Sequence, residues 1–167
     1  MIEFIDVKGV NFRVLELLGK GKGGYSYLVQ NDNGDKFVLK QIHHEPCDYY
    51  TFGNKMESEL RDYEKLVKIG IKMPKLIDFD LENERILKEF INGDTIAQMV
   101  ERSQSVLEFI PQVRAMCNAL YKEGLNIDYY PTNFVIQNGI LYYIDYECNL
   151  YSDQWNFENW GSQYWKS

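Results

Sequence analysis

The amino-acid sequence predicts an α+β fold. Strand patterns lie between residues 12 and 42, one helix pattern and two short strands follow, and helices dominate the middle of the chain before a final hairpin. The strands therefore come first, around one helix, and the later part is mainly helical. This order is the basis for the fold class, and a hinge is expected near 91–93.

The first strands are marked by glycines and turn residues. The apolar run 12–18 ends at Gly19, and a second run, 25–30, follows a cluster of glycines. Asn31-Asp32-Asn33-Gly34 predicts a tight turn, because asparagine and glycine tolerate positive φ. The segment 36–42 then predicts a third strand with Phe37 and Leu39 on one face.

A helix is expected from about 52 to 69, because apolar residues recur there at helical spacing. Gly70 is a natural helix stop, and Pro74 lies just beyond it. Two short strands are expected next, 75–79 and 85–91, separated by a polar turn.

The later part of the chain predicts helices and then a hairpin. Asp94 is expected to cap a short helix that ends near Arg102. A longer helix is expected within 105–123, with its regular part beginning near Pro111, and Gly124 ends it. The remaining expected features are a strand at 134–137, the turn Asn138-Gly139, a strand at 140–145 and an aromatic tail from Tyr151.

Composition narrows the class of protein. The 167 residues are 45% hydrophobic with a net charge of −7, which supports a sizeable core and disfavours a nucleic-acid or anionic-membrane partner. No apolar run is long enough for a membrane span, and the acidic start is unlike a signal peptide. The three cysteines are an odd number at wide spacing, so we expect no disulfide framework and a cytoplasmic location. Only two histidines occur, His43 and His44, so the sequence offers few ligands for a histidine-rich metal site and little support for a serine-protease-like triad.

The glycine-rich segment Gly19–Gly24 contains the pattern GxGxxG. A strand pattern follows it, so it predicts a hairpin rather than the strand-to-helix turn of a dinucleotide-binding fold. A hairpin of bare backbone can lie over phosphates without Cβ clashes. Taken alone, the motif fits a plain flexible hairpin equally well.

Lys40 is a cation inside an apolar strand pattern, a costly arrangement unless the charge is paired. A phosphate-binding lysine held by a helix carboxylate would explain it, and the following helix offers Glu57, Glu59 and Glu64. The plain alternative is a lysine on the solvent face of an edge strand.

A second polar cluster lies late in the chain. Asp128 and Asn133 lie on one loop, and Asp145 ends the next expected strand. Two acids and an amide at loop and strand ends could hold Mg²⁺ through oxygen ligands. Individually, each residue fits better as an ordinary turn acid, loop amide or strand-end cap.

The order of these features resembles the protein-kinase-like superfamily. A glycine-rich hairpin, a strand lysine, a helix glutamate, an Asp-x4-Asn loop and a strand-end aspartate occur in one direction between residues 12 and 147. The chain is most similar to small atypical members: the KEOPS-complex kinase, RIO kinases and aminoglycoside phosphotransferases. The resemblance implies a two-lobe fold, with an antiparallel N-lobe sheet at about 1–91 and a truncated helical C-lobe at about 92–167.

The resemblance also implies roles for individual residues. Asp128 would be the catalytic aspartate, and Asn133 and Asp145 the Mg²⁺ ligands. Lys40 would contact the α- and β-phosphates of ATP. Glu59 is the best match for its helix partner, with Glu57 second. The remaining nucleotide-binding positions would be Gly19, Gly21 and Gly24 in the loop, and Glu89 to Ile91 in an adenine-binding hinge.

Several positions depart from the family pattern. Asn126 stands where the motif has histidine, Glu147 where it has glycine, and Ser26 where it has valine. The chain ends soon after Asp145, without a long activation segment, so the aromatic tail is expected to cover the helical lobe by core packing.

The expected function is therefore that of a minimal Mg²⁺- and ATP-dependent kinase acting on a hydroxyl of a protein or small molecule, with a possible protein partner completing the substrate site. Two alternatives stay open: a pseudokinase that binds nucleotide or acts as a scaffold without turnover, and an interaction module that binds no nucleotide.

Overall fold

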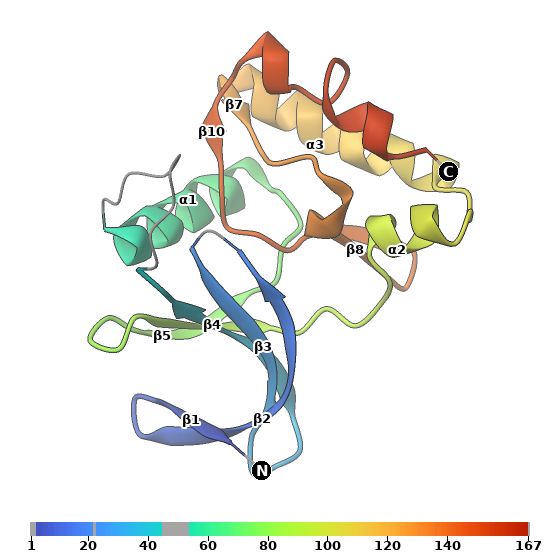
Figure 1. The fold of residues 1–167 in the computed structure, drawn as a ribbon. Coiled ribbons are helices and arrows are strands. Elements are labelled where there is room, and N and C mark those ends of the chain that lie inside the picture. The colour runs from blue at the N-terminus through green and yellow to red at the C-terminus, as the bar shows by residue number, and fades with distance from the viewer. Residues whose placement is uncertain (1–2, 22, 45–53, 167) are drawn as a thin grey trace. The chain divides into compact units, whose positions relative to one another are not determined.

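A computed structural model describes residues 3–21, 23–44 and 54–166 of this chain (Figure 1). These residues form the α+β fold that the sequence predicts. The helices are α1 (Lys55–Ile69), α2 (Ile96–Glu101) and α3 (Ile110–Lys122), with single-turn 3₁₀ helices at Leu107–Phe109, Pro131–Asn133, Asp153–Trp155 and Gly161–Tyr164. The strands are β1 (Phe4–Val7), β2 (Val10–Lys20), β3 (Gly24–Gln30), β4 (Lys36–Ile42), β5 (Leu76–Asp80), β6 (Arg85–Glu89), β7 (Leu125–Asn126), β8 (Phe134–Gln137), β9 (Ile140–Tyr143) and β10 (Asn149–Leu150).

The chain divides into two compact units. The first contains the residues up to Ser58 together with Pro74–Phe90, and the second contains Glu59–Met73 together with the residues from Ile91 onward. One division falls at Phe90 and Ile91, inside the segment that the sequence marks as a hinge. The interpretation of these parts as kinase lobes stays a prediction.

The first unit is built on an antiparallel six-stranded sheet in the order β1-β2-β3-β4-β6-β5, which curls in Figure 1. The strands expected at 12–18, 25–30 and 36–42 are confirmed, and two of them run slightly longer than expected. The turn between β3 and β4 is also confirmed, because the Asn31 side chain accepts hydrogen bonds from the amides of Asn33 and Asp35. β1 is missing from the sequence prediction, since only Val7 of its four residues is buried.

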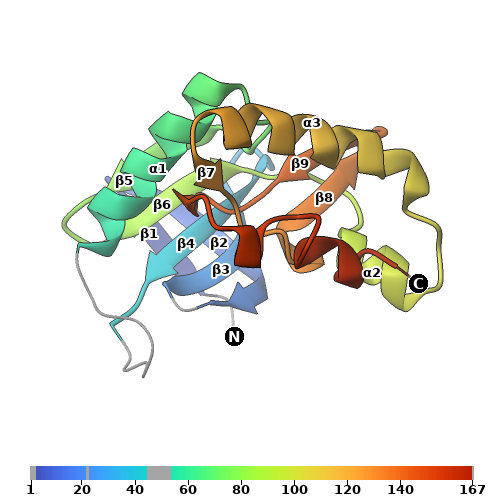
Figure 2. The same cartoon turned by 90° about the horizontal axis from the view of Figure 1, so that it is seen from above.

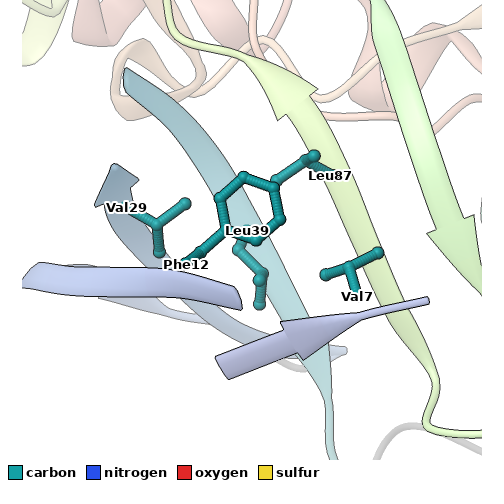
Figure 3. Close-up of a cluster of buried hydrophobic side chains, with 5 residues drawn as sticks. All are labelled: Val7, Phe12, Val29, Leu39 and Leu87. Atoms are coloured by element: carbon teal, nitrogen blue, oxygen red, sulfur yellow. The ribbon is translucent and has the colours of Figure 1, made fainter. Parts of the chain in front are cut away.

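One face of this sheet carries a tight hydrophobic cluster. Figure 3 shows its five buried side chains converging from five strands: Val7, Phe12, Val29, Leu39 and Leu87. The rings of Phe12 and Phe37 also pack edge to face, with centroids 5.8 Å apart. At about 25 cal/mol per Å² of buried apolar surface, such clusters provide most of the stabilisation of a sheet. The strand that bears Lys40 is thus anchored by the buried Leu39 beside it.

Helix α1 ends where the sequence predicts. Gly70 has φ of +94°, and the amides of Gly70 and Ile71 both donate to the Leu66 carbonyl. These bonds satisfy an orphan carbonyl of the last turn, and the positive φ suits glycine. The expected start near 52 lies outside the described residues.

In the second unit, α3 packs beside the β8–β9 hairpin (Figure 2). The Gln112 side chain joins them, because it donates to the Gly139 carbonyl and accepts from the Leu141 amide. The hairpin turn Asn138-Gly139 is confirmed, with φ of +53° and +77°. Pro111 lies in the first turn of α3, as expected. β9 ends at Tyr143, so Asp145 follows the strand rather than ending it, because the pairing with β8 stops at Tyr143 opposite Phe134.

The predicted cap of α2 is wrong by one residue. Thr95, not Asp94, is the N-cap, and its side chain accepts from the Gln98 amide while the Gln98 side chain accepts from the Thr95 amide. This reciprocal capping box satisfies two orphan donors at once, which a lone aspartate could not do. Asp94 instead pairs with Arg102 across 3.1 Å at the surface.

The aromatic tail is partly core and partly surface. Phe157 and Trp165 are buried, whereas Trp155 is 50% exposed. Just before the tail, β10 pairs with β7, a pair of short strands that the sequence does not predict. At the start of the tail, the Tyr151 amide donates to the Gly124 carbonyl. Core packing therefore holds for part of the tail.

No helix in the described residues is long and apolar enough to cross a membrane.

Candidate functional site

The glycine-rich loop joins β2 to β3 in the first unit, as a hairpin. Its described residues are bonded to one another and to His43, the residue that follows β4. The Gly21 amide donates to the Gly24 carbonyl at 2.9 Å, and the His43 amide donates to the Gly23 carbonyl at 3.2 Å. The His43 ring nitrogen Nε2 lies 2.9 Å from the Gly21 carbonyl oxygen. His43 therefore supports this loop, a role that no local sequence signal indicates.

The glycines of this loop meet different constraints. A Cβ on Gly24 would lie 2.5 Å from the Gln41 backbone oxygen, so the sheet itself requires glycine there. A Cβ on Gly19 would meet nothing within 4 Å, and one on Gly21 would only touch the Gly24 oxygen at 4.0 Å. Neither backbone has a positive φ. Packing and conformation thus explain Gly24 but leave Gly19 and Gly21 without a structural need.

Lys40 lies beside the glycine loop. A Cβ on Gly23 would lie 3.6 Å from the Lys40 Nζ, and one on Gly24 would lie 3.2 Å from its Cε. β4 lies between β3 and β6, with Lys40 opposite Ser26 and Ile86, so the alternative of an edge-strand lysine is wrong. The first unit therefore brings the predicted lysine and the predicted loop together.

The two candidate partners of Lys40 differ in exposure. Glu59 is only 8% exposed, whereas Glu57 is exposed and its amide donates to the Asn54 side chain at the start of α1. A buried carboxylate needs a compensating partner more than an exposed one does. Burial therefore favours Glu59, and its pairing with Lys40 stays a prediction.

The expected hinge positions have structural partners of their own. The Glu89 amide donates to the Lys75 carbonyl, and the Glu89 side chain accepts from the Lys75 amide at 3.1 Å. Ile91 is buried, and the Asn92 amide donates to the Gln137 side chain. Adenine recognition by Glu89 and Ile91 stays a prediction.

The second unit brings Asp128 and Asn133 together on one loop. The Asn133 Nδ2 donates to the Asp128 carbonyl at 3.3 Å, and the Asp128 carboxylate accepts from the Tyr130 amide at 3.1 Å. The Asn133 amide in turn donates to the Tyr130 carbonyl. Because Asn133 uses its side-chain nitrogen in this way, its oxygen Oδ1 is the atom left to bind a cation.

Asp145 is tied to this loop through its neighbours. The Ile144 amide donates to the Asn133 carbonyl at 2.9 Å, and the Asp128 amide donates to the Tyr143 hydroxyl at 3.3 Å. That hydroxyl donates to the Glu147 carbonyl at 2.9 Å. Residues on both sides of Asp145 are therefore bonded to the Asp128–Asn133 loop or to one another.

Tyr143 is a site residue that the sequence analysis missed. It is fully buried, and burial together with the charges of Asp145, Glu147 and Asp128 raises the pKa of its phenol well above 10. The strand alternation indicates that Tyr143 is buried, because it shares one face of β9 with Leu141. A buried phenol needs a hydrogen-bond partner. Which partner it takes was not readable from that pattern.

Asn126, at the position of the motif histidine, is also buried. Its side chain donates to the Ser152 carbonyl at 3.1 Å and accepts from the Tyr129 hydroxyl at 3.4 Å. Burial is the main reason that the pKa of Tyr129 is raised above its ordinary range. Asn126 thus supports the loop by fixing the chain around it.

The aromatic tail packs behind the same loop. The Trp165 indole donates to the Tyr129 carbonyl at 2.8 Å, and its ring packs on those of Phe134 and Phe157. A Cβ on Gly161 would lie 2.5 Å from the Tyr129 Cβ, so the tail approaches the loop closely there. The tail therefore holds both the backbone and the ring of Tyr129, the residue that follows Asp128.

The donor set of this unit fits Mg²⁺ bound together with phosphates. Magnesium in nucleotide sites takes one or two carboxylates, and substrate phosphates and water complete its shell. Asp145 and the Asn133 oxygen match that demand. Among the described residues, no three histidine, cysteine, aspartate or glutamate side chains form a group able to hold a metal ion. A magnesium site of this kind would take its remaining ligands from phosphates and water.

A small cavity lies elsewhere in the first unit. It measures about 190 Å³, and its lining includes Val10, Phe12, Ile77 and Asp78. None of the predicted site residues lines it.

No protein-family model matches the chain, and no curated protein matches it.

Proposed function

We propose that this protein is a minimal phosphotransferase of the kinase-like, two-lobe type, which uses Mg²⁺ and ATP. The observation that carries the proposal is the bonding of the second unit, where the Asp128–Asn133 loop is joined to Ile144, next to Asp145. Three oxygen-bearing side chains of the types and order used in phosphoryl transfer thus lie on two connected segments.

The first unit supplies the second argument. Lys40 lies beside a loop whose Gly19 and Gly21 have no packing or conformational need for glycine. Bare backbone at such positions suits the close approach of phosphate oxygens, and a lysine amine beside them supplies the charge. In this proposal Lys40 and the loop orient the triphosphate, and Glu59 orients Lys40.

The roles in the second unit follow from side-chain chemistry. Asp145 and Asn133 hold the metal ion, and Asp128 accepts the proton of the acceptor hydroxyl while that oxygen bonds to the γ-phosphorus. The bond from the γ-phosphorus to the bridging oxygen breaks, and ADP leaves. Bound Mg²⁺ supplies neutralisation of the charge that develops on the phosphoryl oxygens.

The test is ATP turnover by the full chain and by variants with matched controls. Lys40→Ala and Asp145→Asn should each lower γ-phosphate transfer by at least about a hundredfold, while thermal unfolding stays near that of the wild type. Lys36→Ala, at an exposed position of the same strand, should leave turnover unchanged. Labelled ATP is incubated with and without a metabolite and lysate panel, because the acceptor is a protein or a small molecule.

The outcomes separate the alternatives. Unchanged transfer in Lys40→Ala or Asp145→Asn overturns these assignments. A thermal shift with Mg-ATP but no transfer or hydrolysis identifies a pseudokinase, which the Asn126 substitution at the motif histidine makes worth testing. No shift with Mg-ATP or Mg-ADP identifies an interaction module instead.

A further inference from the structure

One phenol oxygen connects the two segments that carry the candidate chemistry. The Tyr143 hydroxyl accepts from the Asp128 amide at 3.3 Å and donates to the Glu147 carbonyl at 2.9 Å. The second bond spans residues 143 to 147 and therefore closes a turn with Asp145 at its centre. The same atom thus fixes the turn that holds Asp145 and bonds to the backbone of Asp128.

The surroundings hold this hydroxyl in place. Tyr143 has no exposed surface, and its ring packs on that of Phe134 with centroids 5.3 Å apart. A neutral phenol can donate to the Glu147 carbonyl and still accept from the Asp128 amide.

Packing alone would not need the oxygen. A phenylalanine would fill the same space against Phe134, and the register of β9 with β8 depends on the backbone and the apolar ring. The hydroxyl bonds to both segments, so its removal separates a positioning role from a packing role.

We propose that Tyr143 is a positioning residue that sets the Asp128 backbone against the turn holding Asp145. The proposal rests on the proposed phosphotransferase function and deepens it, because the proton acceptor and the metal ligand must meet one phosphoryl group. Loss of the hydroxyl leaves both carboxylates present but no longer holds them in one geometry, which lowers kcat more than it changes KM for ATP.

The main experiment compares the full chain with Tyr143→Phe and Tyr142→Phe. Tyr142 precedes it on the same strand and is half-buried, so its variant is the matched control. We expect Tyr143→Phe to lower kcat at least tenfold with KM for ATP changed less than threefold. Tyr142→Phe should keep both constants within twofold of the wild type. A Tyr143→Phe chain that folds and retains kcat within twofold of the wild type overturns the proposal.

Two further measurements keep the result decisive. If the wild type shows no turnover, the proposed function fails, and amide hydrogen exchange of the two chains decides: faster exchange of the Asp128 amide in Tyr143→Phe supports positioning, whereas an equal rate overturns it. If Tyr143→Phe does not fold, amide hydrogen exchange of the wild type decides. Strong protection of the Asp128 amide supports the bond to the hydroxyl, and exchange at an unprotected rate overturns it.

Discussion

In the first unit, Lys40 and the glycine loop lie on neighbouring strands of a six-stranded sheet, whereas in the second unit Asp128, Asn133 and Asp145 all lie outside regular strands. Strand register alone places Lys40 close to the loop, because β3 and β4 pair from Gly24 opposite Ile42 to Gln30 opposite Lys36. The second set depends on hydrogen bonds that Tyr130 and Ile144 donate and on one that the Tyr143 hydroxyl accepts. The difference teaches that one set is held by backbone pairing and the other by buried side chains and loop contacts.

The first prediction tests how far the second unit depends on the aromatic tail, and it carries the largest effect. Trp165→Ala should lower the free energy of unfolding by about 3–5 kcal/mol, because it removes a buried ring and leaves the Tyr129 carbonyl without its indole donor.

Trp155→Ala is the matched control, because it makes the same substitution at a tryptophan that is half exposed. It should lower the free energy of unfolding by less than about 1 kcal/mol. Urea unfolding of both variants is the measurement that tests these values. Equal losses in the two variants would show that the tail does not support the loop by burial.

The second prediction separates the structural from the functional glycines of the first unit. Gly24→Ala should destabilise the chain by about 1–3 kcal/mol, because its Cβ would press on the Gln41 backbone oxygen. Gly19→Ala should change stability by less than about 0.5 kcal/mol, since nothing lies within 4 Å of that Cβ.

The same Gly19→Ala chain should bind Mg-ATP more weakly, as measured by titration calorimetry, if bare backbone is needed for phosphate approach. If this variant binds Mg-ATP with wild-type affinity, Gly19 belongs to a plain hairpin loop and not to a phosphate-binding one.

The third prediction concerns alkaline pH and has the smallest effect. The pKa of Tyr143 is raised well above 10 in the folded chain, and the unfolded phenol ionises near 10. Its contribution to stability is therefore complete below pH 10 and is lost as the pH rises further, by up to about 1.4 kcal/mol per pH unit.

Tyr143→Phe lacks this term, so between pH 10 and 11 its free energy of unfolding should fall less steeply than that of the wild type. Urea unfolding at the two pH values measures both slopes. A variant with the wild-type slope would show that the buried phenol titrates as it does in water.

The predictable part of the fold is the part whose signals lie close together in the chain. Five of the six strands of the first sheet (β2 to β6), the Asn31–Gly34 turn, the end of α1 at Gly70 and the Asn138-Gly139 hairpin were all predicted. Each depends on a periodicity or on a turn residue with a local conformational demand. The α2 cap was misassigned, because Asp94 and Thr95 are both good N-caps and only the reciprocal bonds with Gln98 distinguish them.

The candidate site divides in the same way. The residue types and order from Gly19 to Asp145 were readable, and their chemistry suggested phosphates and Mg²⁺. The contacts that hold those residues were not readable, because His43 meets Gly21 across 22 residues and Tyr143 meets Asp128 across 15. No periodicity encodes such distant pairings.

By itself, then, the sequence determined the α+β order, most helix and strand positions, and the set of residues able to carry phosphoryl-transfer chemistry. Only the tertiary structure decided that Lys40 lies on an interior strand, that Gly24 is needed for packing while Gly19 is not, and that Tyr143 and Trp165 hold the Asp128 loop. The physical reason is range. Backbone propensity and alternation act over a few residues, whereas a buried hydroxyl or indole must find its partner wherever folding brings one.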